Sequence, residues 1–286
     1  MQQEEKFNDW LFRYRYVYRV RRTDKNKRRF LQALVTDIAS MREDVRVIEY
    51  NQQKKTASRN VYVGNVKKAD RIICTYYDTP LAHFGGYRFF DRQVQGKRTT
   101  NLIILSSILM ILLGLAGTLL YMKLATTAFD LSSLYTWLFI AIFGLYFFAL
   151  GKVTQGLSRR KNVIRNTSSV LALLRLMEAA GPNTAFAFLD EGTYGDNGLE
   201  VLRSSTKKQA QIIYLDSIGA NEPLQVIGSG ISKGRLAEAG LTATPGNDVT
   251  YVISGSVEGA GYELTKTAMK QDLNMENLMT VTALLK

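Results

Sequence analysis

The chain has 286 residues, enough for one large domain or two small ones, and hydrophobic residues make up 46% of it. Its 37 Lys and Arg residues outnumber 25 Asp and Glu residues, so the formal net charge is +12. The content of large apolar residues excludes a disordered chain, the single Cys74 excludes an intramolecular disulfide, and the single His83 excludes a metal site that needs two imidazoles.

Residues 1–28 are expected to form a basic, aromatic N-terminal arm, with Asp9–Arg22 reading DWLFRYRYVYRVRR. As a strand, this segment has one aromatic face: Phe12, Tyr14, Tyr16, Tyr18 and Val20. As a helix, it has an apolar stripe beside arginines: Trp10, Leu11, Tyr14, Val17 and Tyr18. This composition suits the interface of an anionic membrane; ordinary packing is the alternative, and nucleic acid is disfavoured. The expected membrane-interface residues are Trp10, Arg13, Arg15, Arg19, Arg159, Arg160 and Lys161.

Residues 29–100 are expected to form the first part of an α/β domain in the cytoplasm. Arg29–Met41 has apolar residues at helical spacing. Three segments have the composition of strands: Val45–Tyr50, Val61–Val63 and Arg71–Tyr76. The last of them leads into Asp78, and His83 in the following loop is expected at the surface. We expect no cleavable signal peptide, because MQQEEKFNDW contains no apolar run.

Residues 101–150 predict a transmembrane hairpin. Leu102–Met122 and Leu131–Leu150 carry no charge, and each is long enough to cross a hydrocarbon core of roughly 30 Å. The linker between them is Lys123–Asp130. Basic residues flank both spans: Arg88, Arg92, Lys97 and Arg98 before, and Lys152, Arg159, Arg160, Lys161 and Arg165 after. The positive-inside rule therefore predicts a two-span protein of the cell membrane with both termini in the cytoplasm.

Residues 151–286 are expected to complete the cytoplasmic domain. Helices are predicted at Thr167–Ala180, which a Thr/Ser cap would open, and at Ser232–Ala239 and Met275–Leu285. Strands are predicted at Ala185–Leu189, Ile212–Leu215, Leu224–Ile227 and Val249–Ile253. Alternating strands and helices indicate an α/β sandwich with a mostly parallel sheet, whose site lies at the carboxyl ends of the strands. Acidic residues follow three of these strands, at Asp78, Asp190 and Asp216.

The order of these segments resembles the M28 family of zinc aminopeptidases, and the resemblance covers about residue 29 to the end. Arg71–Thr79 resembles the strand that carries that family's first metal-binding motif, and Arg165–Val170 (RNTSSV) resembles its helix-opening motif. Tyr194–Gly198 keeps the glycine spacing of its glutamate motif, and Ile212–Gly219 resembles its aspartate strand. The resemblance implies a three-layer aminopeptidase-like sandwich, interrupted here by the hairpin.

The residues that would hold two zinc ions depart from that family pattern. Tyr76 replaces the first histidine, Arg165 replaces the bridging aspartate, and the paired glutamates fall on Gly192 and Thr193. The segment Thr265–Gln271 lacks the late histidine, so Asp216 alone survives as a ligand, with Asp78 as a ligand-orienting residue. A shift of one residue would instead place Glu191 at the general-base position. The resemblance thus marks a vestigial site of Tyr76, Asp78, Arg165, Asn166, Glu191, Gly192, Thr193 and Asp216, and we expect no metal and no other cofactor.

Arg165 admits two interpretations. It can neutralise Asp78 and Asp216 in place of the lost metals, or it can belong to the basic cluster beside the membrane. Either way the sequence favours a membrane-anchored, catalytically inactive protein that serves as a scaffold, adaptor or regulator of another membrane protein. The alternatives are an atypical metal-dependent hydrolase that uses Glu191 and Asp216, and a lipid- or nucleic-acid-binding module that uses the basic arm. Membrane lipid and a membrane protein are the expected partners, and homo-oligomerisation is left open.

Overall fold

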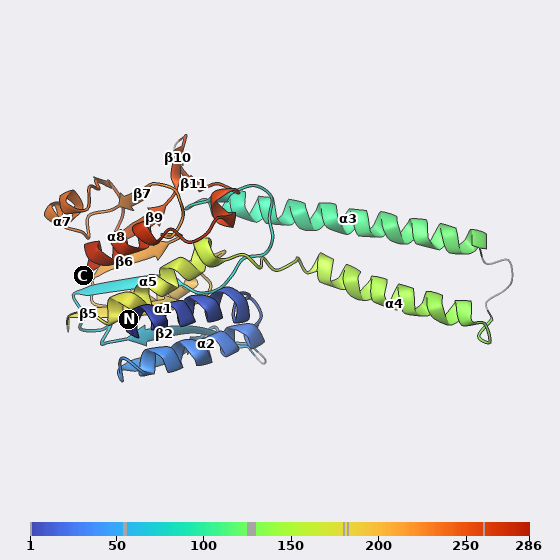
Figure 1. The fold of residues 1–286 in the computed structure, drawn as a ribbon, viewed down its shortest axis with the longest axis horizontal. Helices are drawn as coiled ribbons and strands as arrows, with labels where there is room; N and C mark the ends of the chain where they lie inside the picture. The colour runs from blue at the N-terminus through green and yellow to red at the C-terminus, as the bar shows by residue number, and fades with distance from the viewer. Residues whose placement is uncertain (1, 54–55, 125–129, 180, 182, 260) are drawn as a thin grey trace. The chain divides into compact units, whose positions relative to one another are not determined.

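The computed structural model describes residues 2–53, 56–124, 130–179, 181, 183–259 and 261–286. The chain forms two compact units (Figure 1). The first unit consists of Met1–Pro80, Gly85–Arg92 and Arg159–Lys286, and the second of Leu81–Phe84 and Gln93–Ser158. Residues 1–28 therefore fold as part of the first unit, together with the segments on both sides of the hairpin.

The described part of the first unit contains an eight-stranded sheet of order β1-β2-β5-β3-β6-β9-β7-β8. Its strands are β1 Val45–Tyr50, β2 Ser58–Val63, β3 Arg71–Tyr76, β5 Thr184–Leu189, β6 Gln211–Asp216, β7 Leu224–Ile227, β8 Ala243–Thr244 and β9 Val249–Ser254. The central strands β5, β3, β6 and β9 pair in parallel, as do β7 and β8, whereas β1 with β2, β2 with β5, and β7 with β9 pair antiparallel. This arrangement confirms the predicted mixed α/β fold with a mostly parallel sheet.

Alternation along the central strands builds a core on each face of the sheet. On β3, Ile73 points into the larger core, where α1, α2, α5 and α8 pack, while Ile72 and Cys74 point into the smaller core with Leu202 of α6. The helices are α1 Gln2–Phe12, α2 Asp24–Ala39, α5 Ser168–Met177, α6 Asn197–Ser205, α7 Lys233–Glu238 and α8 Met275–Leu285. A small sheet of β10 Ser256–Glu258, β11 Gly261–Leu264 and β4 Tyr87–Arg88 adds a third cluster.

The N-terminal segment is helical, so its interpretation as a strand was wrong. After α1, the π-helix η1 spans Arg13–Val17, and α2 begins at Asp24 behind a Thr23 cap, five residues before the predicted Arg29. Trp10 is only 2% exposed and packs in the larger core, so we correct its assignment to the membrane interface: a side chain enclosed by protein cannot contact lipid. The guanidinium of Arg13 donates hydrogen bonds to the carboxylates of Asp9 and Asp37, so its charge is paired within the protein.

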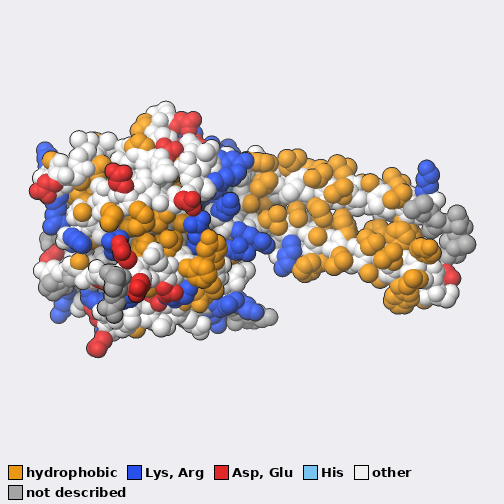
Figure 2. Space-filling model, in the orientation of Figure 1, with side chains coloured by type: hydrophobic (Ala, Val, Ile, Leu, Met, Phe, Trp, Pro, Cys, Tyr) orange, Lys and Arg blue, Asp and Glu red, His pale blue; other side chains and the backbone are white. Residues whose placement is uncertain are grey.

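Two helices among the described residues of the second unit are long and apolar enough to span a membrane: α3 Arg92–Leu124 and α4 Leu134–Thr154. Hydrophobic side chains cover their visible surface (Figure 2). They contact each other through the Tyr146 hydroxyl, which donates to the Met110 carbonyl at 2.9 Å. Of the predicted linker, residues 125–129 lie outside the described residues. His83 is 9% exposed, so the expectation that it lies on the surface was wrong.

Candidate functional site

The carboxyl ends of the parallel strands β5, β3 and β6 meet at one edge of the sheet, because these strands are direct neighbours. Tyr76 ends β3, Asp190 follows β5, and Asp216 ends β6. The three acidic strand ends recognised in the sequence therefore lie at the same edge. The side chains nevertheless divide into two clusters, one around Asp216 and one around Asp78.

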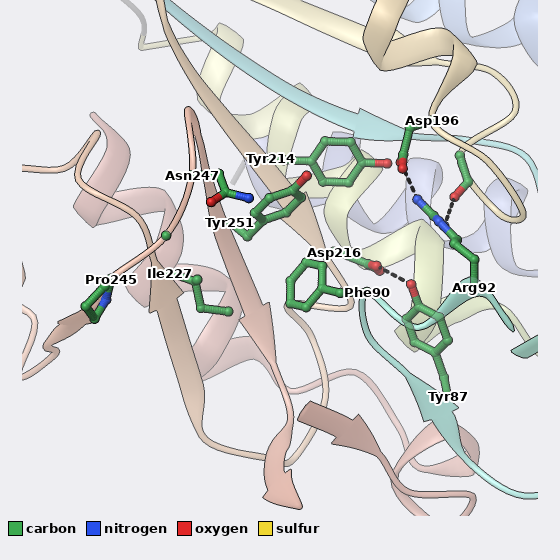
Figure 3. A pocket seen from close by; sticks show the side chains of 12 residues that line it. Tyr87, Phe90, Arg92, Asp196, Tyr214, Asp216, Ile227, Pro245, Asn247 and Tyr251 are labelled. Atoms are coloured by element: carbon green, nitrogen blue, oxygen red, sulfur yellow. Dashed lines mark hydrogen bonds and ion pairs between the residues drawn. The ribbon is translucent and has the colours of Figure 1, made fainter. Parts of the chain in front are cut away.

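The carboxylate of Asp216 accepts three hydrogen bonds from hydroxyl groups. Its Oδ1 accepts from the Tyr76 hydroxyl at 3.1 Å and from the Ser217 hydroxyl at 2.8 Å, and its Oδ2 accepts from the Tyr87 hydroxyl at 2.8 Å (Figure 3 draws the last). Asp216 is 6% exposed, and burial raises its pKa, although Arg165 and these hydroxyls act in the opposite direction. The cluster therefore holds a carboxylate with phenols and a serine, where the resemblance would place zinc.

Arg165 is the cation of this cluster. Its guanidinium lies 3.8 Å from the centroid of the Tyr87 ring, and its side chain is among the largest fully buried ones. Burial disfavours the charge of Arg165, but the neighbouring Tyr76, Tyr87 and Asp216 outweigh that cost and raise its pKa. At 1% exposure Arg165 cannot belong to a basic cluster at a membrane surface, so that interpretation was wrong.

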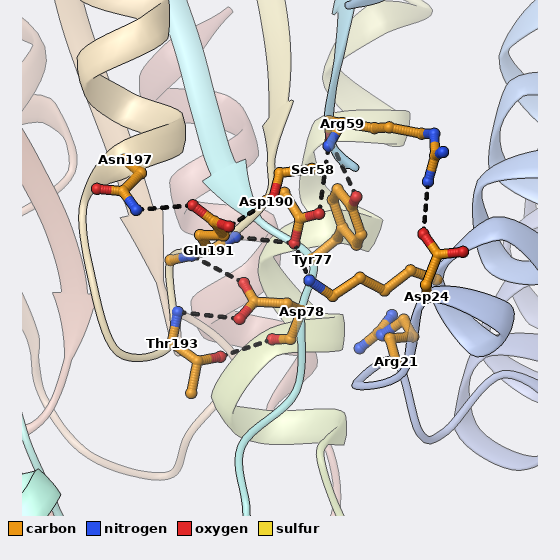
Figure 4. Close-up of polar contacts among 12 residues, drawn as sticks. Arg21, Asp24, Ser58, Arg59, Tyr77, Asp78, Asp190, Glu191, Thr193 and Asn197 are labelled. Carbon is orange, nitrogen blue, oxygen red and sulfur yellow. Dashed lines mark hydrogen bonds and ion pairs between the residues drawn. The ribbon is translucent and has the colours of Figure 1, made fainter. Parts of the chain in front are cut away.

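Asp78 forms the second cluster and holds the loop that follows β5 (Figure 4). Its carboxylate accepts from the backbone amides of Gly192 at 2.9 Å and Thr193 at 3.2 Å, and the Thr193 hydroxyl donates back to the Asp78 carbonyl at 2.9 Å. Burial and then the neighbouring Asp190 raise the pKa of Asp78, and Lys27 lowers it. The cations that act on Asp78 are Lys27 and Arg21, so the predicted pairing of one arginine, Arg165, with both carboxylates is corrected to two separate arrangements.

Asn166 connects the end of β3 with the segment before α5 through hydrogen bonds. Its Nδ2 donates to the carbonyls of Tyr76 at 2.7 Å and Asp78 at 3.3 Å, and its Oδ1 accepts from the buried guanidinium of Arg21. Arg21 also donates to the Thr167 hydroxyl at 2.9 Å. The predicted Thr/Ser cap is therefore wrong. The π-helix η2, Val163–Thr167, runs directly into α5, so Thr167 does not cap α5 with its side chain. Its hydroxyl accepts the hydrogen bond from Arg21 instead.

Gly192 has no room for a side chain. A Cβ atom there would lie 2.2 Å from Cβ and 2.6 Å from Cγ of Tyr76, far inside van der Waals contact. The tyrosine and the glycine are thus a matched pair, and a glutamate at position 192 would require Tyr76 to move. In the sequence the two positions are separate departures from the resembled family pattern, but in the structure the size of one side chain limits the other.

Glu191 makes its hydrogen bonds with residues of β2 and α6. Its carboxylate accepts from the Ser58 hydroxyl at 2.5 Å and from Asn197 Nδ2 at 2.7 Å, and these hydrogen bonds lower its pKa against the effect of burial. Glu191 lines a polar pocket with Lys27 and Ser58, and Asp216 lines a different one. The pair required by the hydrolase alternative is therefore not brought together.

A cavity of about 440 Å³ opens beside Asp216 (Figure 3). Aromatic side chains supply much of its wall: Tyr87, Phe90, Tyr214 and Tyr251. Arg92 lies in the same wall, where it donates to the Gly192 carbonyl at 2.8 Å and forms an ion pair with Asp196. From the sequence, Arg92 is expected only as a membrane-flanking charge, and Tyr87, Phe90 and Arg21 are not expected at a site. The one sequence feature that could have indicated this cavity is the cluster of aromatic residues in Tyr87–Phe90 shortly before Arg92.

The donor set of this site does not fit zinc. Among the described residues there is no group of three or more His, Cys, Asp or Glu side chains that could hold a metal ion. The lone candidate ligand, Asp216, already accepts three hydroxyl donors and faces the guanidinium of Arg165. A divalent cation would have to displace those hydroxyls and would lie close to a buried positive charge.

No protein-family model matches this sequence, and no curated protein matches it as a relative. Several solved structures have a similar fold. A zinc-dependent exopeptidase from Parabacteroides distasonis has a TM-score of 0.55 at 11% identity, with 97% of this chain and 95% of that chain covered. A glutaminyl cyclase from Porphyromonas gingivalis has a TM-score of 0.53 at 12% identity, with 98% and 96% covered.

The LapA aminopeptidase of Legionella pneumophila has a TM-score of 0.51 at 11% identity, and the match covers 98% of this chain and 69% of that chain. At such low identity the comparison concerns the arrangement of the backbone and not the chemistry of the site. The chain therefore has an aminopeptidase-like fold.

Proposed function

We propose that this chain is a membrane-anchored, catalytically inactive relative of the M28 aminopeptidases that serves as a scaffold or adaptor for another membrane protein. The observation that supports this proposal best is that Asp216 accepts hydrogen bonds from three hydroxyl groups beside the buried Arg165. A buried carboxylate that already has its hydrogen bonds and a counter-charge nearby gains little from a metal ion. Three of its roughly four lone-pair sites are taken by the hydroxyl donors, two on Oδ1 and one on Oδ2.

The first expected result concerns metal and activity. The purified full chain, incubated with Zn²⁺ and then desalted, is expected to retain no stoichiometric zinc by elemental analysis and to release no product from aminoacyl substrates. Asp216→Asn is the matched control, because it removes the only remaining candidate ligand. Two zinc ions per chain in the unmodified protein, lost together with hydrolysis in Asp216→Asn, would overturn the proposal.

The second expected result concerns topology. If α3 and α4 cross the membrane, tags at the N-terminus, at the C-terminus and within residues 152–162 should all be shielded in intact cells. A tag within Lys123–Asp130 should be accessible from outside, because two spans return the chain to its starting side. Accessibility of both termini together with shielding of the linker would reverse the orientation. Accessibility of one terminus alone would exclude a two-span hairpin.

The adaptor role rests on the cavity beside Asp216. Its aromatic wall and the Arg92–Asp196 pair suit an apolar side chain next to polar backbone, such as an extended segment of a partner. A photo-crosslinking amino acid at Phe90, which is 50% exposed, should capture one defined membrane protein in native membranes. The same group at the exposed Gln209 should not capture it, and Asn247→Trp, which fills the cavity, should abolish the product. Equal products from positions 90 and 209 would contradict this role.

A further inference from the structure

Three exposed apolar residues stand on the surface of the N-terminal segment. Phe12, Tyr16 and Val17 are 59%, 53% and 54% exposed, although the same segment buries Trp10 and Tyr14 completely or nearly so. The π-helix η1 accounts for the division: the Tyr18 amide bonds to the Arg13 carbonyl at 2.9 Å, and this wide turn changes which positions face the core. Phe12 and Tyr16 contact each other with ring centroids 5.3 Å apart.

A segment from a distant part of the chain lies beside the end of this N-terminal segment, and both carry exposed basic residues. Asn162 Nδ2 donates to the carbonyl of Arg19 at 2.9 Å and to that of Arg159 at 2.7 Å, and this fixes residues 159–162 beside the N-terminal segment. Arg19, Arg160 and Lys161 are all exposed. We call the set Phe12, Tyr16, Val17, Arg19, Arg160 and Lys161 the aromatic–basic surface.

We propose that the aromatic–basic surface docks on the anionic headgroups of the membrane in which the hairpin is anchored. Amphipathic rings beside exposed Arg and Lys are the composition that binds a negatively charged lipid interface. The chain from Thr154, the end of α4, to Lys161 reaches at most roughly 25 Å, so a hairpin in the membrane keeps the basic residues near the bilayer. This inference rests on the membrane anchorage proposed above.

The experiment uses the full chain in vesicles and single cysteine labels. Cys74 is buried, and Cys74→Ala provides a background without other thiols. An environment-sensitive probe is placed at Tyr16→Cys on the surface, at Leu112→Cys in α3, or at Gln209→Cys as an exposed control. With phosphatidylserine in the vesicles, the probes at 16 and 112 should be protected from an aqueous quencher and the probe at 209 should not. With phosphatidylcholine alone, the probe at 16 should lose its protection.

The charge dependence provides the decisive comparison. Joint neutralisation by Arg19→Gln, Arg160→Gln and Lys161→Gln should lower the docking equilibrium constant about a hundredfold, since each basic residue near an anionic surface contributes about fivefold. The matched control neutralises three exposed lysines elsewhere in the first unit, by Lys25→Gln, Lys208→Gln and Lys233→Gln, and should leave docking unchanged.

The outcomes separate this inference from the proposed function. An unprotected probe at 112 refutes membrane anchorage itself. Protection at 112 without protection at 16 refutes only the lipid-docking surface. Protection at 16 that is equal in neutral and anionic vesicles refutes recognition of headgroup charge. Binding of single-stranded RNA by the full chain that requires the same three basic residues, with no protection at 16, would assign the surface to nucleic acid instead.

Discussion

Replacing Arg165 by alanine is expected to destabilise the first unit by about 3–5 kcal/mol, because it leaves Asp216 buried without its cation. The change also removes the contact of the guanidinium with the Tyr87 ring. The measurement is urea unfolding of the detergent-solubilised full chain, followed by the fluorescence of the buried Trp10. A Trp137→Phe background removes the only other tryptophan.

A second substitution tests the electrostatic origin of that loss. Asp216→Asn in the Arg165→Ala background should recover part of the stability, because the unpaired negative charge is removed. Asp78→Asn should not recover it, since Asp78 is bonded to Gly192 and Thr193 and lies with Lys27. Arg160→Ala is the matched control and should change the free energy of unfolding by less than about 0.5 kcal/mol. Strict additivity of Arg165→Ala and Asp216→Asn would show that the two charges do not interact.

Replacing Lys27 by methionine is expected to lower the free energy of unfolding of the first unit by about 3 kcal/mol at neutral pH. Lys27 Nζ lies 2.5 Å from Asp190 Oδ1, with side-chain exposures of 17% and 1%, and Asp78 is close to both. Without the ammonium group, two buried carboxylates face each other. Lys25→Met on the same helix removes an exposed lysine and should have little effect. The same Trp10 unfolding measurement reports both variants.

The loss of stability in Lys27→Met should become larger as the pH rises and smaller as the pH falls. The pKa of Asp78 is already raised above its ordinary value of 3.8, and removal of Lys27 raises it further. Between the unfolded and the folded pKa the folded chain binds more protons, so stability falls as pH rises through that window and returns as pH is lowered. The variant should therefore regain stability relative to the unmodified chain as the pH is lowered from neutral towards the ordinary carboxyl value of 3.8. A penalty that stays constant over that range would exclude a carboxylate origin.

Local patterns in the sequence were sufficient for much of the fold. The predicted bounds of β1, β3, β7 and α8 agree with the structure, because β-branched and aromatic residues mark the strands and helical apolar spacing marks α8. Short elements such as β4, β8 and β10 were missed, since two or three residues carry no periodicity. The π-helices at residues 13–17 and 163–167 were also missed, and with them the division of the N-terminal segment into buried and exposed residues.

The sequence by itself determined the class of fold, the two apolar helices and the lack of a second histidine for a metal site. All of these depend on residue types and their spacing along the chain. The tertiary structure alone decided which charges meet. Arg21 reaches Asn166 across 145 residues, Arg92 lies in the cavity wall, and Arg165 acts on Asp216 whereas Lys27 acts on Asp78. These pairings follow from the order of strands in the sheet, which joins segments distant in sequence, and no local pattern encodes that order.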